Sequence, residues 1–503
     1  MLSCAVSRHG IPRRQVACLS DGGVWLFDAI GYKEHGMRRV YRLAGGVASL
    51  ILLLTQALAA APPTAGSLQC GGFAQNDAVV GGGFPPNAHV AVGAQHFGQV
   101  VQNAVRFSTR ALTGNCPTTI VLNSSLSAFI GYTTKPLFDP RLVYDLTANR
   151  WLLSVAAQPE SSTIQYHFIM VSIDSDPTHG FYKHQFNMAS IVGAGVLWDF
   201  PMLGYDQKML ILTGNKLDAT PKYIGSVVVF LRKKEMYKLQ TVPPYLCSFQ
   251  GPLYNVGTIA PPIVLNQGPY TALAAADLSA SVIRVYKFHG TFQACPTFLG
   301  SSDIATFMLA PPLAEQPGSG ACPAPNCLDT GDGRFHNPGI QSGAGTDQSP
   351  VRFWQVRTDQ DSGFPTPLTY KVNADTLAVE ESCQIFAGVS SFDFNPAIVA
   401  NEAGTIFVTW SSTDPVASVN AQVRISGKLS GDACTVMQSG APVSQSSNPL
   451  TGNLDANVGH QRWGDYSAVA LDPLDHNTVY GVNETIDTSG TTWKSFIFNM
   501  HNP

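Results

Sequence analysis

One short pattern recurs along the chain, an apolar strand that turns tightly into a second apolar strand. It is clearest in residues 86–103, 139–155, 199–213, 395–411 and 465–483, and weaker forms occupy 263–275 and 335–356. Apolar runs on both sides of a turn rich in Gly, Pro, Asn or Asp are typical of β-hairpins. The units recur about every 50 to 70 residues, which indicates a repeat architecture.

Repeats of this length, each built from short antiparallel strands, predict β-propeller blades. A blade buries both faces only when a neighbour packs on each side, and closing the ring protects the strand edges. We therefore expect an all-β fold, a seven-bladed β-propeller in a single domain over residues 76–503. Val79 and Val80 are expected to supply a strand that completes the last blade. A pair of β-sandwiches or a β-helix is the alternative.

The composition agrees with many short strands and excludes one class of partner. Only 13% of the 503 residues are charged, while 46 are glycine and 34 are proline. Long surface helices need charged residues on their wet face, so such helices are not expected. The net charge of −4 leaves no basic surface for nucleic acid. We expect a monomer that does not bind nucleic acid.

A targeting signal precedes the repeats. Three arginines follow Met37 closely, and an apolar run over 43–54 then ends in small residues up to Ala60. This order of basic, apolar and small residues defines a secretory signal peptide, which we assign to residues 37–60. The alternative, a membrane anchor, needs about 20 apolar residues.

The signal peptide sets the remaining boundaries. Residues 1–36 are then an upstream extension that is absent from the mature protein, and residues 61–75 form a flexible leader to the propeller domain. We expect a secreted or periplasmic protein with no membrane span after cleavage of the signal peptide.

Cysteine usage agrees with export. Eight cysteines follow the signal peptide: Cys70, Cys116, Cys247, Cys295, Cys322, Cys327, Cys383 and Cys434. An even number in an exported protein predicts disulfides. Nearest-neighbour pairing joins 70–116, 247–295, 322–327 and 383–434, although the sequence alone does not fix the connectivity. Neither a CxxC pair nor a Cys/His cluster has zinc spacing, so no zinc site is expected.

Several segments carry a family resemblance. These are PPNAHVAVG, FDPRLVYDLTANRWLLS, DFPMLGYD, GSVVVFLRKKEM, SPVRFWQVR and GHQRWGDYSAVALDPLDHNTVYGVNET. In sequence and spacing they resemble a family of exported bacterial β-propeller proteins, over roughly residues 80–500. The resemblance implies the fold and export, but no common activity. The chain departs from the family at 87–89, where the family often has Asp-Thr-Asn, and around 335–337.

Polar residues stand just before the apolar strands, where a propeller brings them together at one mouth of the ring. Asp139, Asp199 and Asp465 are candidate catalytic acids or bases, with Tyr466 or His336 as a partner. The candidate ligand-binding residues are Arg141, Arg334, His336, Arg462 and Trp463. Arginines suit a carboxylate ligand because they bind it with two hydrogen bonds. The same mouth is expected to receive Asn87, His89, Trp198, Asn337, Asn395 and His460.

We expect the mouth to bind a glycan or protein ligand. A second interpretation is a carbohydrate-active hydrolase or lyase that acts on an acidic glycan. The segment 487–493 favours a glycan slightly, because it resembles a sialidase-type Asp-box with one extra residue. A third interpretation is an architectural envelope protein, in which these residues only cap turns and pack. Asp139, Asp199 and Asp465 also form a weak candidate Ca²⁺ site. We expect no other cofactor, and binding rather than catalysis.

Overall fold

The computed structural model describes residues 3–5, 15–20, 23–28, 62–110, 116, 119–239, 246–290 and 295–502. The chain forms two compact units, Met1–Ala59 and Ala60–Pro503. In the first unit, β1 (Ser3–Ala5), β2 (Gln15–Ser20) and β3 (Gly23–Asp28) form an antiparallel sheet. The expected signal peptide, 37–60, lies outside the described residues. Within the described ranges, no helix is both long and apolar enough to cross a membrane.

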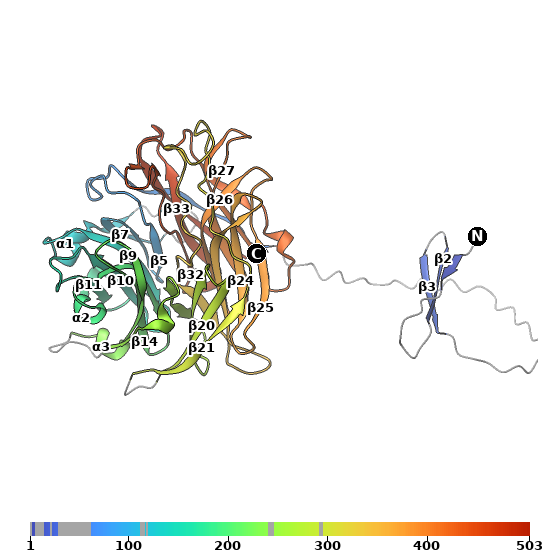
Figure 1. Cartoon of the computed structure of the whole chain (residues 1–503), viewed down its shortest axis with the longest axis horizontal. Helices are drawn as coiled ribbons and strands as arrows, with labels where there is room; N and C mark the ends of the chain where they lie inside the picture. The colour runs from blue at the N-terminus through green and yellow to red at the C-terminus, as the bar shows by residue number, and fades with distance from the viewer. Residues whose placement is uncertain are drawn as a thin grey trace, which may run out of the picture. The chain divides into compact units, whose positions relative to one another are not determined.

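The second unit is all-β and consists of antiparallel sheets that follow one another along the chain (Figure 1). The first sheet has β5 (His89–Val92), β6 (His96–Val101), β7 (Ala104–Thr109) and β8 (Ile120–Ser125). The second has β9 (Leu137–Asp145), β10 (Arg150–Ala157), β11 (Tyr166–Ser172) and β12 (Phe181–Asn187). A third four-stranded sheet has β17 (Ile259–Ala260), β19 (Thr271–Asp277), β20 (Val282–His289) and β21 (Thr297–Ala305).

Two more four-stranded sheets come from the last third of the chain. One has β26 (Phe392–Ala400), β27 (Ile406–Asp414), β28 (Val419–Lys428) and β29 (Ala441–Gln445). The other has β32 (Ala468–Asp472), β33 (Asp475–Ile486), β34 (Trp493–His501) and, from the start of the unit, β4 (Thr64–Ala74). The short pair β30 (Leu454–Asp455) and β31 (His460–Gln461) lies between them in sequence.

A nine-stranded sheet contains two further four-stranded groups. One is β13 (Leu197–Tyr205), β14 (Met209–Leu217), β15 (Tyr223–Arg232) and β16 (Leu246–Phe249). The other is β22 (Gly339–Ser342), β23 (Arg352–Asp361), β24 (Phe364–Asn373) and β25 (Ala378–Gln384). Strand β18 (Pro262–Val264) joins the two groups because it pairs in parallel with both β13 and β22.

In the parts of the chain that the structure describes, helices are few and short. They are α1 (Leu126–Ile130), α2 (Ala189–Val192), α3 (Lys233–Met236) and the 3₁₀ turns η1 (Pro177–His179), η2 (Pro252–Tyr254) and η3 (Cys434–Val436). The low content of charged residues accounts for this, because long exposed helices need a charged face. The helices therefore serve as connections between strands.

The hydrophobic cores lie between successive sheets. Phe107 of the first sheet packs edge-on against Trp151 of the second, with ring centroids 4.9 Å apart. One core contains Val90 and Val101 of the first sheet together with Val482 and Trp493 of the last. The last sheet thus packs against the first, as well as against the sheet that precedes it in the chain.

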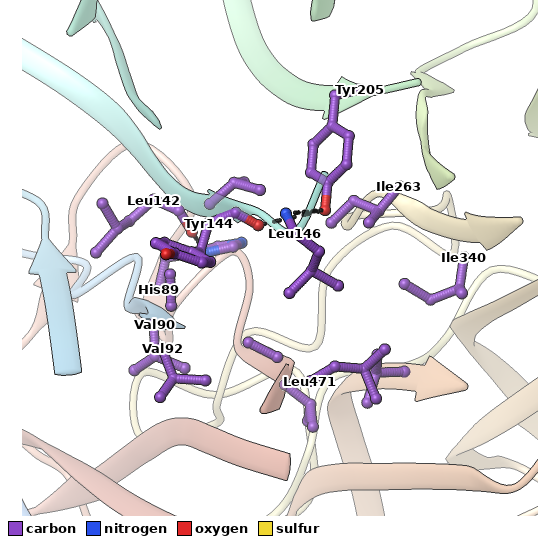
Figure 2. Close-up of a pocket in the computed structure, with 15 residues that line it drawn as sticks. His89, Val90, Val92, Leu142, Tyr144, Leu146, Tyr205, Ile263, Ile340 and Leu471 are labelled. Atoms are coloured by element: carbon purple, nitrogen blue, oxygen red, sulfur yellow. Dashed lines mark hydrogen bonds between the residues drawn. The ribbon is translucent and has the colours of Figure 1, made fainter. Parts of the chain in front are cut away.

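The first strands of six four-stranded groups, together with β18, surround a small apolar cavity of about 50 Å³ (Figure 2). Its walls include His89 and Leu142, Tyr144, Tyr205, Ile263, Ile340, Val399 and Leu471. The hydroxyl of Tyr205 points toward Leu146 and is satisfied by backbone groups: it donates to Tyr144 O at 3.3 Å and accepts from Leu146 N at 3.1 Å (Figure 2). Strands far apart in sequence therefore meet around one point.

The segment expected as a flexible leader, 61–75, forms strand β4 over most of its length. It pairs antiparallel with β34, from Lys494 opposite Ala74 to His501 opposite Thr64. Leu68, Cys70 and Phe73 are buried on one side of this strand. The outer strand of the last sheet is thus β4 and not Val79–Val80, which lie in a turn. Strand β4 covers the edge of β34 and so satisfies the backbone N–H and C=O groups there. This explains why β4 is the outer strand of the last sheet.

Among the described residues of the second unit, four disulfides join cysteines that are nearest in sequence. The pairs are Cys70–Cys116, Cys247–Cys295, Cys322–Cys327 and Cys383–Cys434. The nearest-neighbour pairing is confirmed. Disulfides form and persist in oxidising compartments, so they indicate an extracellular or periplasmic protein.

Truncating Phe73 to alanine tests whether β4 belongs to the core. Phe73 has no exposed surface, so we expect Phe73→Ala to lower the free energy of unfolding by about 3–5 kcal/mol, measured by urea denaturation. Gln69→Ala, on the exposed side of the same strand, is the control and should change it by less than about 0.5 kcal/mol. Equal small effects of both variants would mean that β4 does not pack.

Candidate functional site

A polar cavity of about 540 Å³ opens where the first strands of several sheets begin. We call it the polar cavity. It is lined by Pro85, Asn87, Gln102, Phe138, Asp139, Gln158, Asp199, Phe200, Leu313, Asp329, Gly331, Asp332, Arg334, His336, Val458, His460, Arg462 and Asp465. Six of the nine candidate site residues therefore line one space: Asp139, Asp199, Asp465, Arg334, His336 and Arg462.

The backbone at the start of these strands has a repeated irregularity. Asn87, Asp139, Phe200 and Asn395 all have positive φ, between 46° and 51°. Asn and Asp adopt this left-handed conformation more readily than other non-glycine residues. The strand register shifts near Asp139, Phe200 and Asn395, as expected for β-bulges. A bulge turns the local side chain, which explains how residues at the start of a strand come to face the cavity.

Asn87 links two of the acids. Its side-chain Nδ2 donates to Asp139 Oδ1 at 2.9 Å and to Asp465 Oδ2 at 3.1 Å. Its Oδ1 accepts the backbone N–H of Asp465 at 2.9 Å. Both carboxylate oxygens contact the same nitrogen atom. The distance between the two oxygens is therefore at most 6.0 Å, which is the sum of the two hydrogen-bond lengths. One amide thus fixes the spacing of two carboxyl groups from opposite ends of the sequence.

The acids have unequal electrostatic environments. Burial, together with the negative charges of Asp199 and Asp465, raises the pKa of Asp139 to about 8. Burial also raises the pKa of Asp199, although the backbone N–H of Phe200 opposes this shift. Neither carboxyl forms an ion pair with a described residue, whereas Arg462 Nη2 lies 2.5 Å from Asp465 Oδ1. At neutral pH Asp139 therefore holds a proton.

Both arginines of the polar cavity are engaged by carboxylates. Arg334 Nε donates to Asp332 Oδ2 at 2.5 Å, and Arg334 Nη1 donates to the Thr258 hydroxyl. The side chain of His336 lies 3.0 Å from the other oxygen of Asp332. Burial of the Asp332 carboxyl raises its pKa, but the contacts with Arg334 and His336 outweigh this and lower the pKa of Asp332.

Arg462 is shared among three carboxylates. Besides Asp465, its Nε lies 3.4 Å from Asp329 Oδ2 and its Nη1 lies 3.9 Å from Asp455 Oδ2. Chiefly through the charge of Asp465, these contacts raise the pKa of Arg462. The guanidinium is therefore neutralised within the wall of the cavity.

The remaining three candidates are buried and do not line the polar cavity. Arg141 has no exposed surface; its Nε donates to Pro201 O at 3.0 Å and its guanidinium lies 3.3 Å from the centre of the Tyr466 ring. The Tyr466 hydroxyl donates to Pro140 O at 2.9 Å. Trp463 Nε1 donates to the Ser411 hydroxyl at 3.1 Å. These three side chains are buried and bond to the surrounding protein, so they belong to the structural framework. The expectation that Arg141 and Trp463 face a ligand is therefore corrected.

The other residues expected at the mouth divide in the same way. Asn87 and His460 line the polar cavity, whereas His89 faces the apolar cavity and Trp198 is buried against His167. Burial, together with the charge of Arg141, lowers the pKa of His89 to about 3, so its ring is neutral. Asn337 and Asn395 are also buried and bond within the framework.

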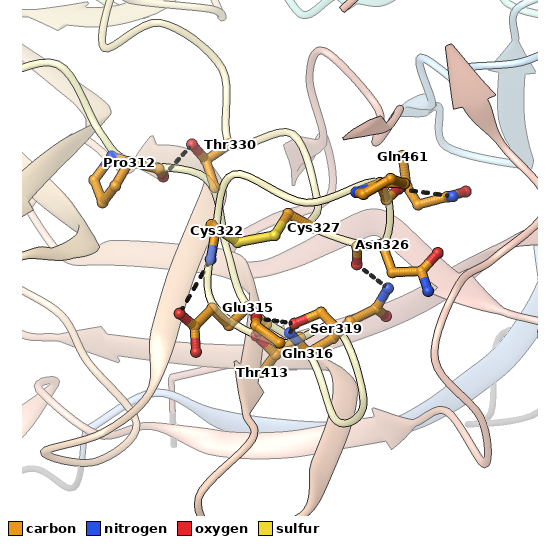
Figure 3. Close-up of a disulfide and its surroundings, with 12 residues drawn as sticks. Pro312, Glu315, Gln316, Ser319, Cys322, Asn326, Cys327, Thr330, Thr413 and Gln461 are labelled. Atoms are coloured by element: carbon orange, nitrogen blue, oxygen red, sulfur yellow. Dashed lines mark hydrogen bonds between the residues drawn. A yellow bond between two sulfur atoms is a disulfide. The ribbon is translucent and has the colours of Figure 1, made fainter. Parts of the chain in front are cut away.

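Sequence reasoning missed the wall that segment 306–338 builds between β21 and β22. The Cys322–Cys327 disulfide closes a short loop in it (Figure 3). Gln461 N donates to Cys327 O at 2.9 Å, and Gln316 Nε2 donates to Leu450 O at 2.7 Å. The segment thereby places Leu313, Asp329 and Asp332 on the cavity wall. The only sequence feature that marks this segment is a cluster of Asp and Gly residues before 335–337, where the chain departs from the family pattern.

A metal site is not built from these acids in the part of the chain that is described. The three-residue group there with metal-ligand spacing is Glu381, Cys383 and Cys434. The two cysteines form a disulfide, so they offer no thiolate. Lys428 Nζ lies 2.9 Å from Glu381 and neutralises it. This group is therefore a structural contact.

No protein-family model matches the chain, and no curated protein matches it. Among solved structures, the chain is similar to a protein of unknown function from Dyadobacter fermentans, with a TM-score of 0.35 and 9% identity over 83% of this chain and 94% of that chain. It is also similar to the GH93 alpha-L-arabinofuranosidase of Fusarium graminearum (TM-score 0.34, 9% identity, 82% and 92% covered). A third is Trypanosoma rangeli sialidase (TM-score 0.32, 9% identity, 71% and 53% covered). Similarities this low carry no argument about this chain.

The raised pKa of Asp139 predicts how stability varies with pH. The folded protein keeps the proton up to about pH 8, while the unfolded chain loses it near pH 4, so the stability contributed by this group falls as pH rises between these values. Asp139→Asn removes that fall, and Asn suits the positive φ because Asn395 has the same φ of 51°. We expect the variant to gain up to about 1.4 kcal/mol relative to wild type per pH unit.

The measurement is urea unfolding at pH 5, 6 and 7. The matched control is Asp347→Asn, which removes a charge from an exposed loop that does not line the polar cavity. The unfolding free energy of Asp347→Asn should change with pH in parallel with that of the wild type. A parallel curve for Asp139→Asn as well would mean that the carboxyl of Asp139 has an ordinary pKa.

Proposed function

We propose that the protein is an exported, closed seven-bladed β-propeller that binds a glycan in the polar cavity. The observation that carries the proposal is the convergence of six titratable side chains, from two strands and two connecting segments far apart in the sequence, on one cavity. Two features support a ring: the last sheet packs against the first, and the first strands of six groups surround one apolar cavity. The seven four-stranded groups, which include two within the nine-stranded sheet, are then the blades.

The chemistry of the cavity suits a ligand with many hydroxyl groups. Hydroxyls both donate and accept, and the wall offers carboxyl oxygens beside guanidinium and imidazole nitrogens. Phe138, Phe200 and Leu313 add apolar surface for the C–H faces of a sugar ring. A volume of about 540 Å³ lies within the usual range of ligand pockets. The same resemblance that predicts export leads us to propose membership of the exported bacterial propeller family.

Glycoside hydrolysis is the second candidate, and the pair of Asp139 and Asp465 favours it. Hydrolases of this kind use one protonated and one ionised carboxyl, about 5–5.5 Å apart in retaining enzymes. Asp139 keeps its proton at neutral pH, and its oxygen lies no more than 6.0 Å from that of Asp465. In this scheme Asp139 donates its proton to the leaving oxygen. Asp465 is the nucleophile that attacks the anomeric carbon as the bond to that oxygen breaks.

Glycan binding is tested with the purified protein on a glycan array, followed by calorimetry with the best ligand. We expect Asp465→Asn to weaken binding at least about tenfold, because a charged acceptor and its bond to Arg462 are lost. Asp347→Asn should leave the affinity unchanged. A ligand whose affinity does not change in Asp465→Asn binds elsewhere. The absence of any glycan ligand would overturn the proposal.

Hydrolysis is tested by release of reducing ends from the glycans that bind. We expect Asp139→Asn to lower the rate at least about 100-fold while binding persists, because the proton donor is gone. The wild-type rate should fall as pH rises through about 8, where Asp139 loses its proton. Release that continues in Asp139→Asn would remove Asp139 from the role of acid.

A further inference from the structure

The polar cavity has more negative than positive groups. Five carboxyl groups line it, against two guanidinium groups, Arg334 and Arg462. The carboxyls belong to Asp139, Asp199, Asp329, Asp332 and Asp465. The cavity as a whole therefore has a shortage of cations.

The two arginines are not free to meet an anionic ligand. Arg334 uses Nε and Nη2 for Asp332 and Nη1 for Thr258. Arg462 has carboxylates on each side, with Asp465 nearest at 2.5 Å. An acidic glycan would have to displace these intramolecular partners and also approach the remaining carboxyls. Like charges at short range in a partly buried site repel, so the acidic glycan expected from the sequence is disfavoured.

Asp139 and Asp199 stand apart from this network. Neither forms an ion pair with a Lys, Arg or His among the described residues. Asp139 is only 7% exposed, and it lines the cavity. Its Oδ1 accepts from Asn87, while its Oδ2 has no hydrogen-bond partner in the described part of the chain. Oδ2 is not one of the buried side-chain atoms left without a partner, so it is open to the cavity, where water or a ligand can donate to it.

We propose that the glycan held in the polar cavity carries a free amine, and that the ammonium group binds at Asp139 and Asp199. This inference rests on the proposed glycan site and names its ligand class, an amino sugar. An ammonium group supplies up to three donors together with the missing positive charge. The hydroxyls of the same sugar occupy the rest of the wall.

The electrostatics of the acids agree with a cationic ligand. Repulsion among Asp139, Asp199 and Asp465 adds to burial in raising the pKa of Asp139, so Asp139 holds a proton at pH 6 in the free protein. A bound cation relieves that repulsion and favours loss of this proton. His336 lies against Asp332 and His460 lies 3.6 Å from Asp329, so neither imidazole neutralises Asp139. The charges of Arg334 and Arg462 favour the ionised form of Asp199, and that of Arg141 favours the ionised form of Asp139, but none of these arginines forms an ion pair with either carboxyl. A ligand amine is therefore the counter-charge that can reach these two carboxyls directly.

The test compares three tetrasaccharides by calorimetry at pH 6, where sugar amines are protonated. They are the tetramer of glucosamine, the matched tetramer of N-acetylglucosamine and the tetramer of galacturonic acid. We expect the glucosamine tetramer to bind at least tenfold more tightly than the acetylated one, and the uronate to bind most weakly. Added salt should weaken binding of the amine selectively, because part of the attraction is screened.

Variants locate the amine. Asp199→Asn should cost the glucosamine tetramer at least tenfold in affinity and the acetylated tetramer less than twofold. Asp139→Asn should act in the same direction but cost less affinity than Asp199→Asn, because Asp139 holds a proton at pH 6. Thermal melts confirm that each variant is folded. Asp347→Asn, which removes the same charge elsewhere, should alter neither affinity.

The outcomes separate the two proposals. Equal affinity for the amine and its acetylated partner would overturn the amine inference and leave the glycan site standing. Tighter binding of the uronate, or an amine preference that survives both Asp199→Asn and Asp139→Asn, would also overturn it. If none of the three tetrasaccharides binds, while another glycan binds in a manner sensitive to Asp465→Asn, the ligand class is wrong but the site is right. No binding of any glycan would overturn both.

Discussion

The architecture depends on the pairing of β4 with β34. This pairing adds a strand from the start of the second unit to the sheet that ends it, so the last sheet has four strands instead of three. Cys70 lies on β4 and its disulfide reaches Cys116, beyond the first sheet's third strand. The core that contains Phe73 and Trp493 then joins the last sheet to the first. The positions of Asn87 and Asp465, and so the polar cavity, follow from that union.

Much of this arrangement was predictable from sequence because it is local. Apolar runs on both sides of a turn predicted the hairpins, and nearest-neighbour pairing of the cysteines, one of several possible connectivities, agrees with the four disulfides described. Strand β4 was missed because glycines at 66, 71 and 72 interrupt its pattern, and its partner lies at the other end of the chain. Segment 306–338 was missed for a similar reason: long-range bonds to Leu450 and Gln461 fix its place, and no periodicity marks it.

The candidate site shows the same division within a single motif. Position before a first strand predicted that Asp139, Asp199 and Asp465 would meet, and they line one cavity. The motif around Arg462 did not tell which side chains face inward. Arg462 and Asp465 reach the cavity, whereas Trp463 and Tyr466 pack beneath it. The four residues alternate within one short segment, so their order in the sequence does not tell which of them face the cavity; the path of the backbone does.

The position of β4 also has a consequence for synthesis and export. Trp493 N donates to the side chain of Gln75 across 418 residues of sequence, so β4 leaves the ribosome long before its partner. During that interval β4 is an unpaired strand with an apolar side, a form that other chains can capture by edge pairing. A nascent chain of this protein is thus most vulnerable to misassembly just before its final strand emerges. Any truncation that removes the last strand leaves this hazard permanent.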